Sequence, residues 1–197
     1  MINVIYDFET LSQNQLDCPI VSCAFLVFDD DRFLTSPYSF EELVEETKFI
    51  KFDIEDQVKN WNRKIDIKTL QWWKEQEPEA LKTIKPSKED VSIENLHSWF
   101  VNNVNWDKVK KVYTRNNTFD PIILQYFLKQ NNHKMPYPWW LIRDTKSFID
   151  GLTYGHDIKD SFIPPECENK FTKHNPIHDV VLDVMRMQTL IVAKFGE

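Results

Sequence analysis

The sequence predicts an α/β fold with a mixed β-sheet flanked by helices in a single domain, residues 1–197. Short apolar runs typical of buried strands come first, and segments with apolar residues at helical spacing are interleaved later. This order is typical of a layered α/β domain. With 197 residues, of which 42% are hydrophobic, the chain is long enough to bury one sizeable core.

Three strands and a short helix are predicted in the first quarter of the chain. Residues 2–8 (INVIYDF) and 20–28 (IVSCAFLVF) are apolar runs typical of buried strands, and the segment between them is turn-like. A short helix is expected around residues 40–46 (FEELVEE). Residues 49–54 (FIKFDI) predict a third strand.

The next segments are predicted to be helical. Residues 67–83 predict two short helices that break before Pro78, since the residue before a proline disfavours the helical conformation. Ser92 is expected to cap a further helix. That helix carries three apolar residues on one face, which are Leu96, Trp99 and Phe100.

Two strands and two longer helices are predicted in the second half. Residues 109–114 and 139–144 are the expected strands. Asp120 and Pro121 open a helix, because proline is well placed in a first turn whose N–H groups lack partners. Apolar residues follow there at helical spacing, at Ile122, Ile123, Tyr126 and Phe127. The last helix follows Pro176 and extends to about Phe195.

The composition excludes several function classes. No apolar stretch approaches the roughly 18–20 residues that cross a bilayer, so no membrane partner is expected. Three glycines are too few for a glycine-rich phosphate loop. Three cysteines without CxxC spacing predict reduced thiols in a cytosolic protein. A net charge of −7 is unlike that of a protein that grips duplex DNA through many phosphates.

Acidic residues are the main candidates for chemistry. Asp7 and Glu9 are two residues apart on the first strand, so their side chains share a face; exposed acids would show the same spacing. Asp120 is a further candidate, or else an N-cap. Asp179 or Asp183 would complete a set of four. Four carboxylates suit two Mg²⁺ or Mn²⁺ ions and phosphodiester hydrolysis, with a neutral histidine as general base.

Three motifs in chain order resemble those of the DEDDh 3′–5′ exonucleases of the DnaQ-like superfamily. They are DFET at residues 7–10, NNTFD at 116–120 and an HxxxxD pattern near the end. The segments KFDIEDQ, TLQWWKEQEPEALKTIKPSKEDVS and HNPIHDVVLDVMRM are similar to the bacteriophage exonuclease A branch of that family. The likeness spans the chain from Ile2 to about Ile191, and the related exoribonuclease branch shares the QWWKEQ-type helix.

The resemblance implies a ribonuclease H-like fold and assigns roles by position. Asp7, Glu9, Asp120 and one terminal aspartate would bind two divalent ions, Mg²⁺ or Mn²⁺, and a terminal histidine would be the base. The implied substrate is single-stranded DNA, shortened from its 3′ end to nucleoside 5′-monophosphates, with RNA as the alternative. A non-catalytic nucleic-acid-binding domain is the alternative from another class. The likeness to phage enzymes implies action in the host cytoplasm, and the sequence leaves open whether the protein is a monomer or a homodimer.

Candidate substrate contacts are less specific. Trp72 and Trp73 are adjacent, so on a helix their side chains point roughly 100° apart and one of them can stack on a base while the other packs in the core. Thr10 and Leu11 follow the DFE triplet and are candidates to contact the terminal nucleotide, with a plain turn as the alternative. Phe119 is a candidate stacking residue or a core residue. Lys108, Lys110 and Lys111 form a small basic cluster typical of a solvated face.

The segment HNPIHDVVLD offers two histidine–aspartate pairs with the same spacing. Pro176 favours a helix start with Asn175 as its cap, which leaves His174 in a loop and Asp179 in the first turn. His178 and Asp183 would both lie in the helix, where five residues separate side chains by roughly 140°. We therefore expect His174 to be the base and Asp179 the ligand. His178 would face solvent or support the site, and Asp183 would stand behind the ligands or be a surface acid.

Overall fold

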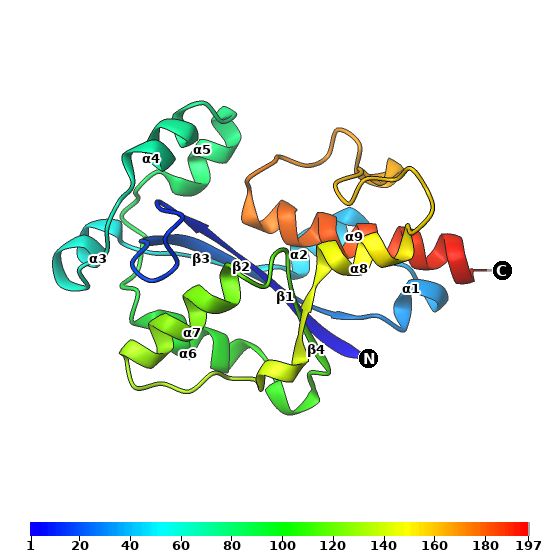
Figure 1. The fold of residues 1–197 in the computed structure, drawn as a ribbon, viewed down its shortest axis with the longest axis horizontal. Helices are drawn as coiled ribbons and strands as arrows, with labels where there is room; N and C mark the ends of the chain where they lie inside the picture. Colours follow the sequence, from blue (N-terminus) through cyan, green and yellow to red (C-terminus); the bar gives the residue numbers. More distant parts are fainter. Residues whose placement is uncertain (197) are drawn as a thin grey trace.

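The computed structural model describes residues 1–196 as a five-stranded mixed sheet with helices on both faces (Figure 1). The order of strands across the sheet is β3-β2-β1-β4-β5. The strands are β1 (Ile2–Thr10), β2 (Ile20–Asp29), β3 (Lys48–Lys51), β4 (Lys111–Thr114) and β5 (Ile142–Asp144). The α-helices are α1 (Arg32–Thr35), α2 (Phe40–Glu46), α3 (Ile54–Asn60), α4 (Ile67–Lys74), α5 (Pro78–Ile84), α6 (Asn95–Asn103), α7 (Asp120–Gln130), α8 (Thr145–Leu152) and α9 (Pro176–Phe195).

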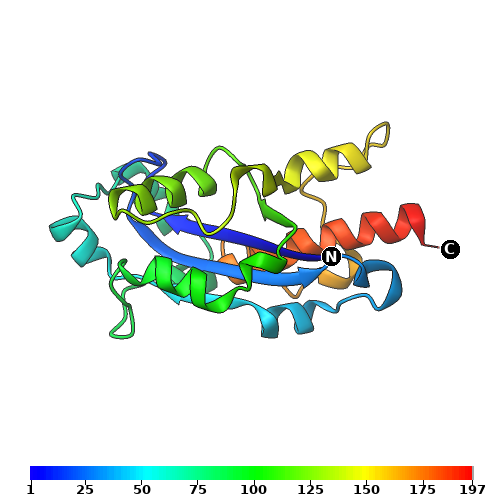
Figure 2. The same ribbon diagram turned by 90° about the horizontal axis from the view of Figure 1, so that it is seen from below.

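The central strand β1 pairs with neighbours of opposite direction. It runs antiparallel to β2 along nearly its whole length and parallel to β4 over Asn3–Ile5, so the predicted mixed sheet is confirmed. β3 extends the sheet antiparallel to β2, and β5 extends it parallel to β4. Figure 2 shows β1 and β2, the two blue strands, side by side in the middle of the molecule.

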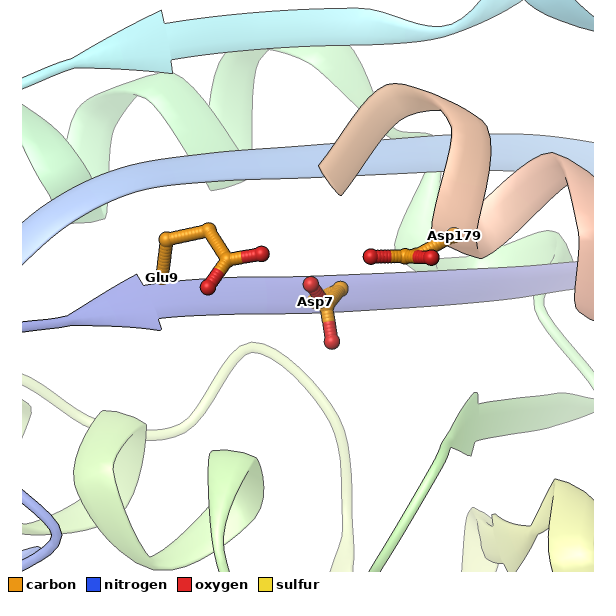
Figure 3. A group of neighbouring side chains, drawn as sticks. All are labelled: Asp7, Glu9 and Asp179. Atoms are coloured by element: carbon orange, nitrogen blue, oxygen red, sulfur yellow. The ribbon is translucent and has the colours of Figure 1, made fainter. Parts of the chain in front are cut away.

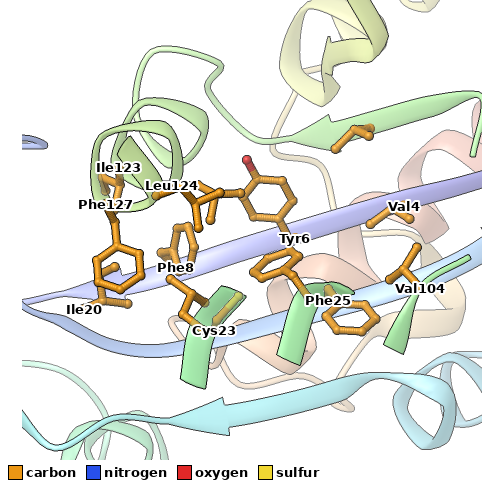
Figure 4. Packing of buried hydrophobic residues seen from close by; sticks show 14 of the residues in the cluster. Val4, Tyr6, Phe8, Ile20, Cys23, Phe25, Val104, Ile123, Leu124 and Phe127 are labelled. Atoms are coloured by element: carbon orange, nitrogen blue, oxygen red, sulfur yellow. The ribbon is translucent and has the colours of Figure 1, made fainter. Parts of the chain in front are cut away.

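Alternation along β1 sends successive side chains to opposite faces. Val4, Tyr6 and Phe8 enter a core shared with α6 and α7 (Figure 4). Ile5 enters the second core, which α9 and α8 cover from the other face. Asp7 and Glu9 continue on the Ile5 face, where the apolar surface ends. The carboxyl end of β1 therefore presents acids beside the start of α9.

The last helix begins as the sequence predicts. The side chain of Asn175 accepts a hydrogen bond from the N–H of Ile177 at 3.1 Å, and Pro176 occupies the first turn. α9 then runs to Phe195, with Val180, Val181 and Val184 buried against the sheet. This start places Asp179 in the first turn, at the edge of the core.

Several local predictions were wrong at their boundaries. The third strand ends at Lys51, because Asp53 caps α3 by accepting from the N–H of Asp56 at 3.0 Å. Residues 139–141 form a 3₁₀ turn, and β5 covers only Ile142–Asp144. Ser92 does not cap α6, because the helix begins after Glu94. The hydroxyl of Ser92 donates instead to the carboxylate of Asp56 at 3.2 Å.

The helices α1, α3 and α8 were not predicted. Each is short, from four to eight residues. The start of α8 had a local signal, since Asp144 accepts from the N–H of Ser147 at 3.2 Å and caps the helix. The predicted α2, α4, α5, α6 and α7 are present, with a break before Pro78 as expected.

Candidate active site

The acids of β1 and α9 meet at the carboxyl end of the central strand. Asp7, Glu9 and Asp179 each offer a carboxylate oxygen, and these oxygens lie within 4.8 Å of one another (Figure 3). The three side chains point toward one another from two elements separated by more than 160 residues in the chain. Asp7 and Glu9 therefore share a face, as predicted, but they are not freely exposed acids.

Asp120 joins this cluster from the opposite layer. It is 3% exposed and is the first residue of α7, while Phe119 occupies the cap position without a side-chain cap bond. Its Oδ1 accepts the backbone N–H of Phe8 at 3.0 Å. The pairing of β1 with β4 ends at Ile5 and Tyr113, so the carboxylate replaces a ladder partner for Phe8. The N-cap alternative for Asp120 was wrong.

Burial raises the pKa values of all four acids, and repulsion by neighbouring carboxylates adds to this effect at Asp7, Glu9 and Asp179. Burial is the main cause in each case, and it raises the pKa of Asp120 and of Asp179 to about 7. Burial and then the charge of Asp120 raise the pKa of Asp7 well above its ordinary range, and burial and then Asp179 do the same for Glu9. We refer to Asp7, Glu9, Asp120 and Asp179 as the four-acid cluster. Clustered carboxylates with disfavoured charge are a donor set that fits hard divalent cations.

His174 lies in the loop before α9 and lines the same cleft as the four-acid cluster. Its backbone has φ 63°, a left-handed conformation that is uncommon outside glycine. Its ring centroid is 4.8 Å from that of Trp72 and 6.2 Å from that of Trp73, in edge-to-face geometry. Burial, and then the charge of Lys173, lower the pKa of His174. The imidazole is therefore neutral at pH 7 and has a nitrogen lone pair to accept a proton.

His178 lies outside the lining of that cleft and supports the loop. Its Nδ1 accepts the backbone N–H of Thr172 at 2.7 Å, and its ring packs edge-on against Phe40 with 5.5 Å between centroids. Burial lowers its pKa as well. Of the two predicted possibilities for His178, solvent exposure or support, the structure agrees with support.

Asp183 is 2% exposed, so the surface-acid alternative was wrong. Its Oδ1 accepts from Arg115 at 2.6 Å and from Arg186 at 2.7 Å, and its Oδ2 accepts from the hydroxyl of Thr145 at 2.5 Å. Arg115 also pairs with Asp160 at 2.7 Å. Sequence reasoning assigned no role to either arginine. Both had a local signal, since Arg115 directly precedes the NNTFD motif and Arg186 lies within the HNPIHDVVLDVMRM segment.

The candidate substrate contacts separate into buried and cleft-facing groups. Trp73 is 2% exposed and its Nε1 donates to the carbonyl of Thr10 at 3.0 Å, while Trp72 is 41% exposed. The prediction that one of these two tryptophans packs in the core is confirmed. Thr10 and Leu11 are buried, and Leu11 packs with Trp73. Phe119 is partly buried, packs against the core of α6 and α7, and also lines the cleft.

The cleft that these elements enclose has a volume of about 500 Å³. One wall is β1 with Asp7 and Glu9, and the start of α7 contributes Asp120. The opposite wall is the start of α9 and the long loop that precedes it, with Ser161, Ile163, Phe171, Lys173 and His174. Carboxylates, a neutral histidine and cations from several elements therefore converge on one concave surface.

The sequence matches a family described as the 3′-5′ exoribonuclease Rv2179c-like domain over residues 2–191. The chain belongs to this family. The Rv2179c-like chain is also 30% identical to the exodeoxyribonuclease of Enterobacteria phage T4, over 205 residues that cover 95% of this chain and 88% of the phage protein. It is thus a 3′–5′ exonuclease, as the motifs predicted.

Solved structures confirm the DnaQ-like, ribonuclease H-like fold of this Rv2179c-like domain. A zinc-bound complex of Escherichia coli exonuclease I with single-stranded DNA is similar to it with a TM-score of 0.60 at 14% identity. Cell-death related nuclease 4 is similar with the same TM-score and identity. These matches cover 98% of this chain, which spans only 41% of the exonuclease I chain and 64% of the other nuclease. DnaQ-like exonucleases use divalent metal ions. No helix among residues 1–196 has the length and apolar character to cross a membrane.

Proposed function

We propose that this 3′–5′ exonuclease degrades single-stranded DNA from the 3′ end and releases nucleoside 5′-monophosphates, with two divalent ions and His174 as general base. The observation that carries the proposal is the four-acid cluster with a neutral histidine in one cleft. The T4 relative, named an exodeoxyribonuclease and covered over 88% of its length, favours DNA over the RNA in the family's description. The phage relative also supports action in the cytoplasm of a host cell.

The acids and the histidine of the site have different roles. Asp7, Glu9 and Asp179 would hold Mg²⁺ or Mn²⁺ through their converging oxygens, and Asp120 would complete the set. Two such ions, when bound, acidify a water molecule and stabilise the charge that develops on the departing 3′ oxygen. His174 would accept the proton of the attacking water, since its lowered pKa keeps it neutral at pH 7.

Aromatic residues at the cleft would position the substrate. Trp72 is partly exposed beside His174, and Phe119 lines the cleft, so each offers a ring on which a terminal base can stack. Trp73 and Leu11 are buried, so they would support the site indirectly by holding α4 against the end of β1. A direct contact of Thr10, Leu11 or Trp73 with the terminal nucleotide stays a prediction.

The test is mononucleotide release from 3′-to-5′ digestion of labelled DNA and RNA oligonucleotides of one sequence, with Mg²⁺ or Mn²⁺. Release is expected to be faster from DNA and to be lost in Asp7→Ala and Asp179→Ala. Asp120→Asn is a matched variant, because its amide oxygen can still accept from Phe8 while the charge is gone. We expect it to fold and to lose activity.

A pair of histidine variants tests the base. His174→Gln is expected to lose activity, while His178→Gln keeps an acceptor for the N–H of Thr172 and is expected to stay active. Activity that survives in Asp7→Ala would contradict the metal assignment. Loss in His178→Gln with activity in His174→Gln would reverse the choice of base. Faster release from RNA would reverse the choice of substrate and leave the site assignments standing.

A further inference from the structure

Three lysine and arginine side chains line the cleft, and two of them form ion pairs with aspartates. Arg115 bridges Asp183 and Asp160 at 2.6 and 2.7 Å. Arg186 pairs with Asp183 at 2.7 Å and donates from Nε to the carbonyl of Phe162 at 2.7 Å. Lys173 lines the cleft, is exposed, and has no ion pair or side-chain hydrogen bond with any of residues 1–196.

The backbone around Lys173 is fixed on both sides. On its N-terminal side, the N–H of Thr172 is bound by His178 at 2.7 Å, and Lys170 pairs with Glu41 at 2.8 Å. On its C-terminal side, His174 packs against Trp72, and Asn175 caps α9. Lys173 therefore belongs to a segment whose backbone is held in place, and it lines the same cleft as Asp7 and Glu9 of β1.

The charges of the cleft leave one positive charge uncompensated. Two divalent ions would balance the four-acid cluster. Arg115 and Arg186 are paired with Asp183 and Asp160, and Lys146, which does not line the cleft, also lies 3.9 Å from Asp160. Lys173 then carries the excess positive charge on the wall beside His174. A phosphodiester carries one negative charge, so the single positive charge of Lys173 would balance one backbone phosphate.

We propose that Lys173 is a substrate-binding residue that contacts the phosphate at the cleavage position, the group that becomes the 5′-phosphate of the released nucleotide. The proposal rests on the proposed function. It adds a contact outside the acids and the histidine, made by the residue directly before His174. Lys170, three residues earlier and paired with Glu41, is the matched control.

The experiment measures binding of thymidine 5′-monophosphate to the full chain with Mg²⁺ by titration calorimetry, at several salt concentrations. Lys173→Gln is expected to bind about tenfold more weakly, the size of one partly exposed charge-assisted hydrogen bond, and to lose part of the salt dependence. Lys173→Arg keeps the charge and is expected to stay within about threefold of the wild type. Lys170→Gln is expected to match the wild type.

Three outcomes would overturn the proposal. They are unchanged binding in Lys173→Gln, an equal loss in Lys170→Gln, and a loss in Lys173→Arg as large as in Lys173→Gln. The oligonucleotide digestion assay on the wild type separates this failure from failure of the proposed function. An active wild type whose Lys173→Gln variant binds the nucleotide normally would remove only this contact. DNA and RNA share the phosphate, so the proposed Lys173 contact is the same for either substrate.

Discussion

Asp183→Asn tests whether the buried acid behind the candidate metal site holds the fold together. The substitution keeps the side-chain shape and one oxygen but removes the charge that faces two guanidinium groups. Arg186 is the critical partner, because its side chain is 9% exposed and would keep a buried charge without its counter-ion. Arg115 is 31% exposed and retains Asp160, so its contribution is smaller.

Removal of one partner from a buried ion pair costs about 3–5 kcal/mol of unfolding free energy. The amide oxygen can still accept one hydrogen bond, and Arg186 keeps the carbonyls of Phe162 and Ser161. We therefore expect a loss near the lower limit, about 3 kcal/mol. In a domain of this size, that corresponds to a decrease of roughly 6–12 °C in Tm.

The assay is urea unfolding followed by circular dichroism, together with a thermal scan. Asp160→Asn is the control, because it removes the other acid from Arg115 at a more exposed position, where the side chain is 23% accessible. A surface pair of this kind contributes at most about 1 kcal/mol. Equal destabilisation by the two variants, or a loss below about 1 kcal/mol in Asp183→Asn, would refute the reasoning that burial makes Asp183 critical.

Two further predictions concern pH and the tryptophan pair. The raised pKa values of the four-acid cluster stabilise the metal-free fold below pH 4, and this contribution is lost as the pH rises through the folded values, about 7 for Asp120 and Asp179. Without metal, the urea midpoint should fall between pH 5 and pH 8, and Mn²⁺ should restore it at pH 8; a flat profile would contradict the shifts. Trp73→Phe should lower the free energy of unfolding, measured in urea, by about 2–3 kcal/mol, because the carbonyl of Thr10 loses its hydrogen bond from the indole N–H. Trp72→Phe should change the free energy of unfolding by under about 1 kcal/mol, because Trp72 is exposed. Equal losses in the two variants would argue against the anchoring role of Trp73.

The site was predictable where short-range geometry decides. Alternation along a strand places Asp7 and Glu9 on one face whatever surrounds them. A proline at a helix start separates His174 in the loop from Asp179 in the first turn, because its ring fixes φ and its missing N–H costs nothing there. The motif order then indicated the family, which the match over residues 2–191 confirmed.

Predictions that needed a neighbour from elsewhere in the chain were less successful. Asp120 has the sequence of a helix cap, yet its carboxylate binds the N–H of Phe8, 112 positions away. Residues 139–144 begin with an apolar run that indicates a strand, but only Ile142–Asp144 pairs with β4, and both tryptophans lie in the preceding 3₁₀ turn. Local propensity cannot indicate whether a partner strand is present.

The sequence by itself determined which residues could do the chemistry and on which side of each element they stand, since these depend on bond geometry over a few residues. Only the tertiary structure decided that Asp183 is buried and pairs with Arg115. It also decided that Lys173 lines the cleft without an ion pair to any of residues 1–196. Charge compensation depends on distances of a few ångströms between groups far apart in the chain, as for Arg115 and Asp183, which are 68 positions apart. Such distances are set when the layers pack, and no spacing along the chain encodes them locally.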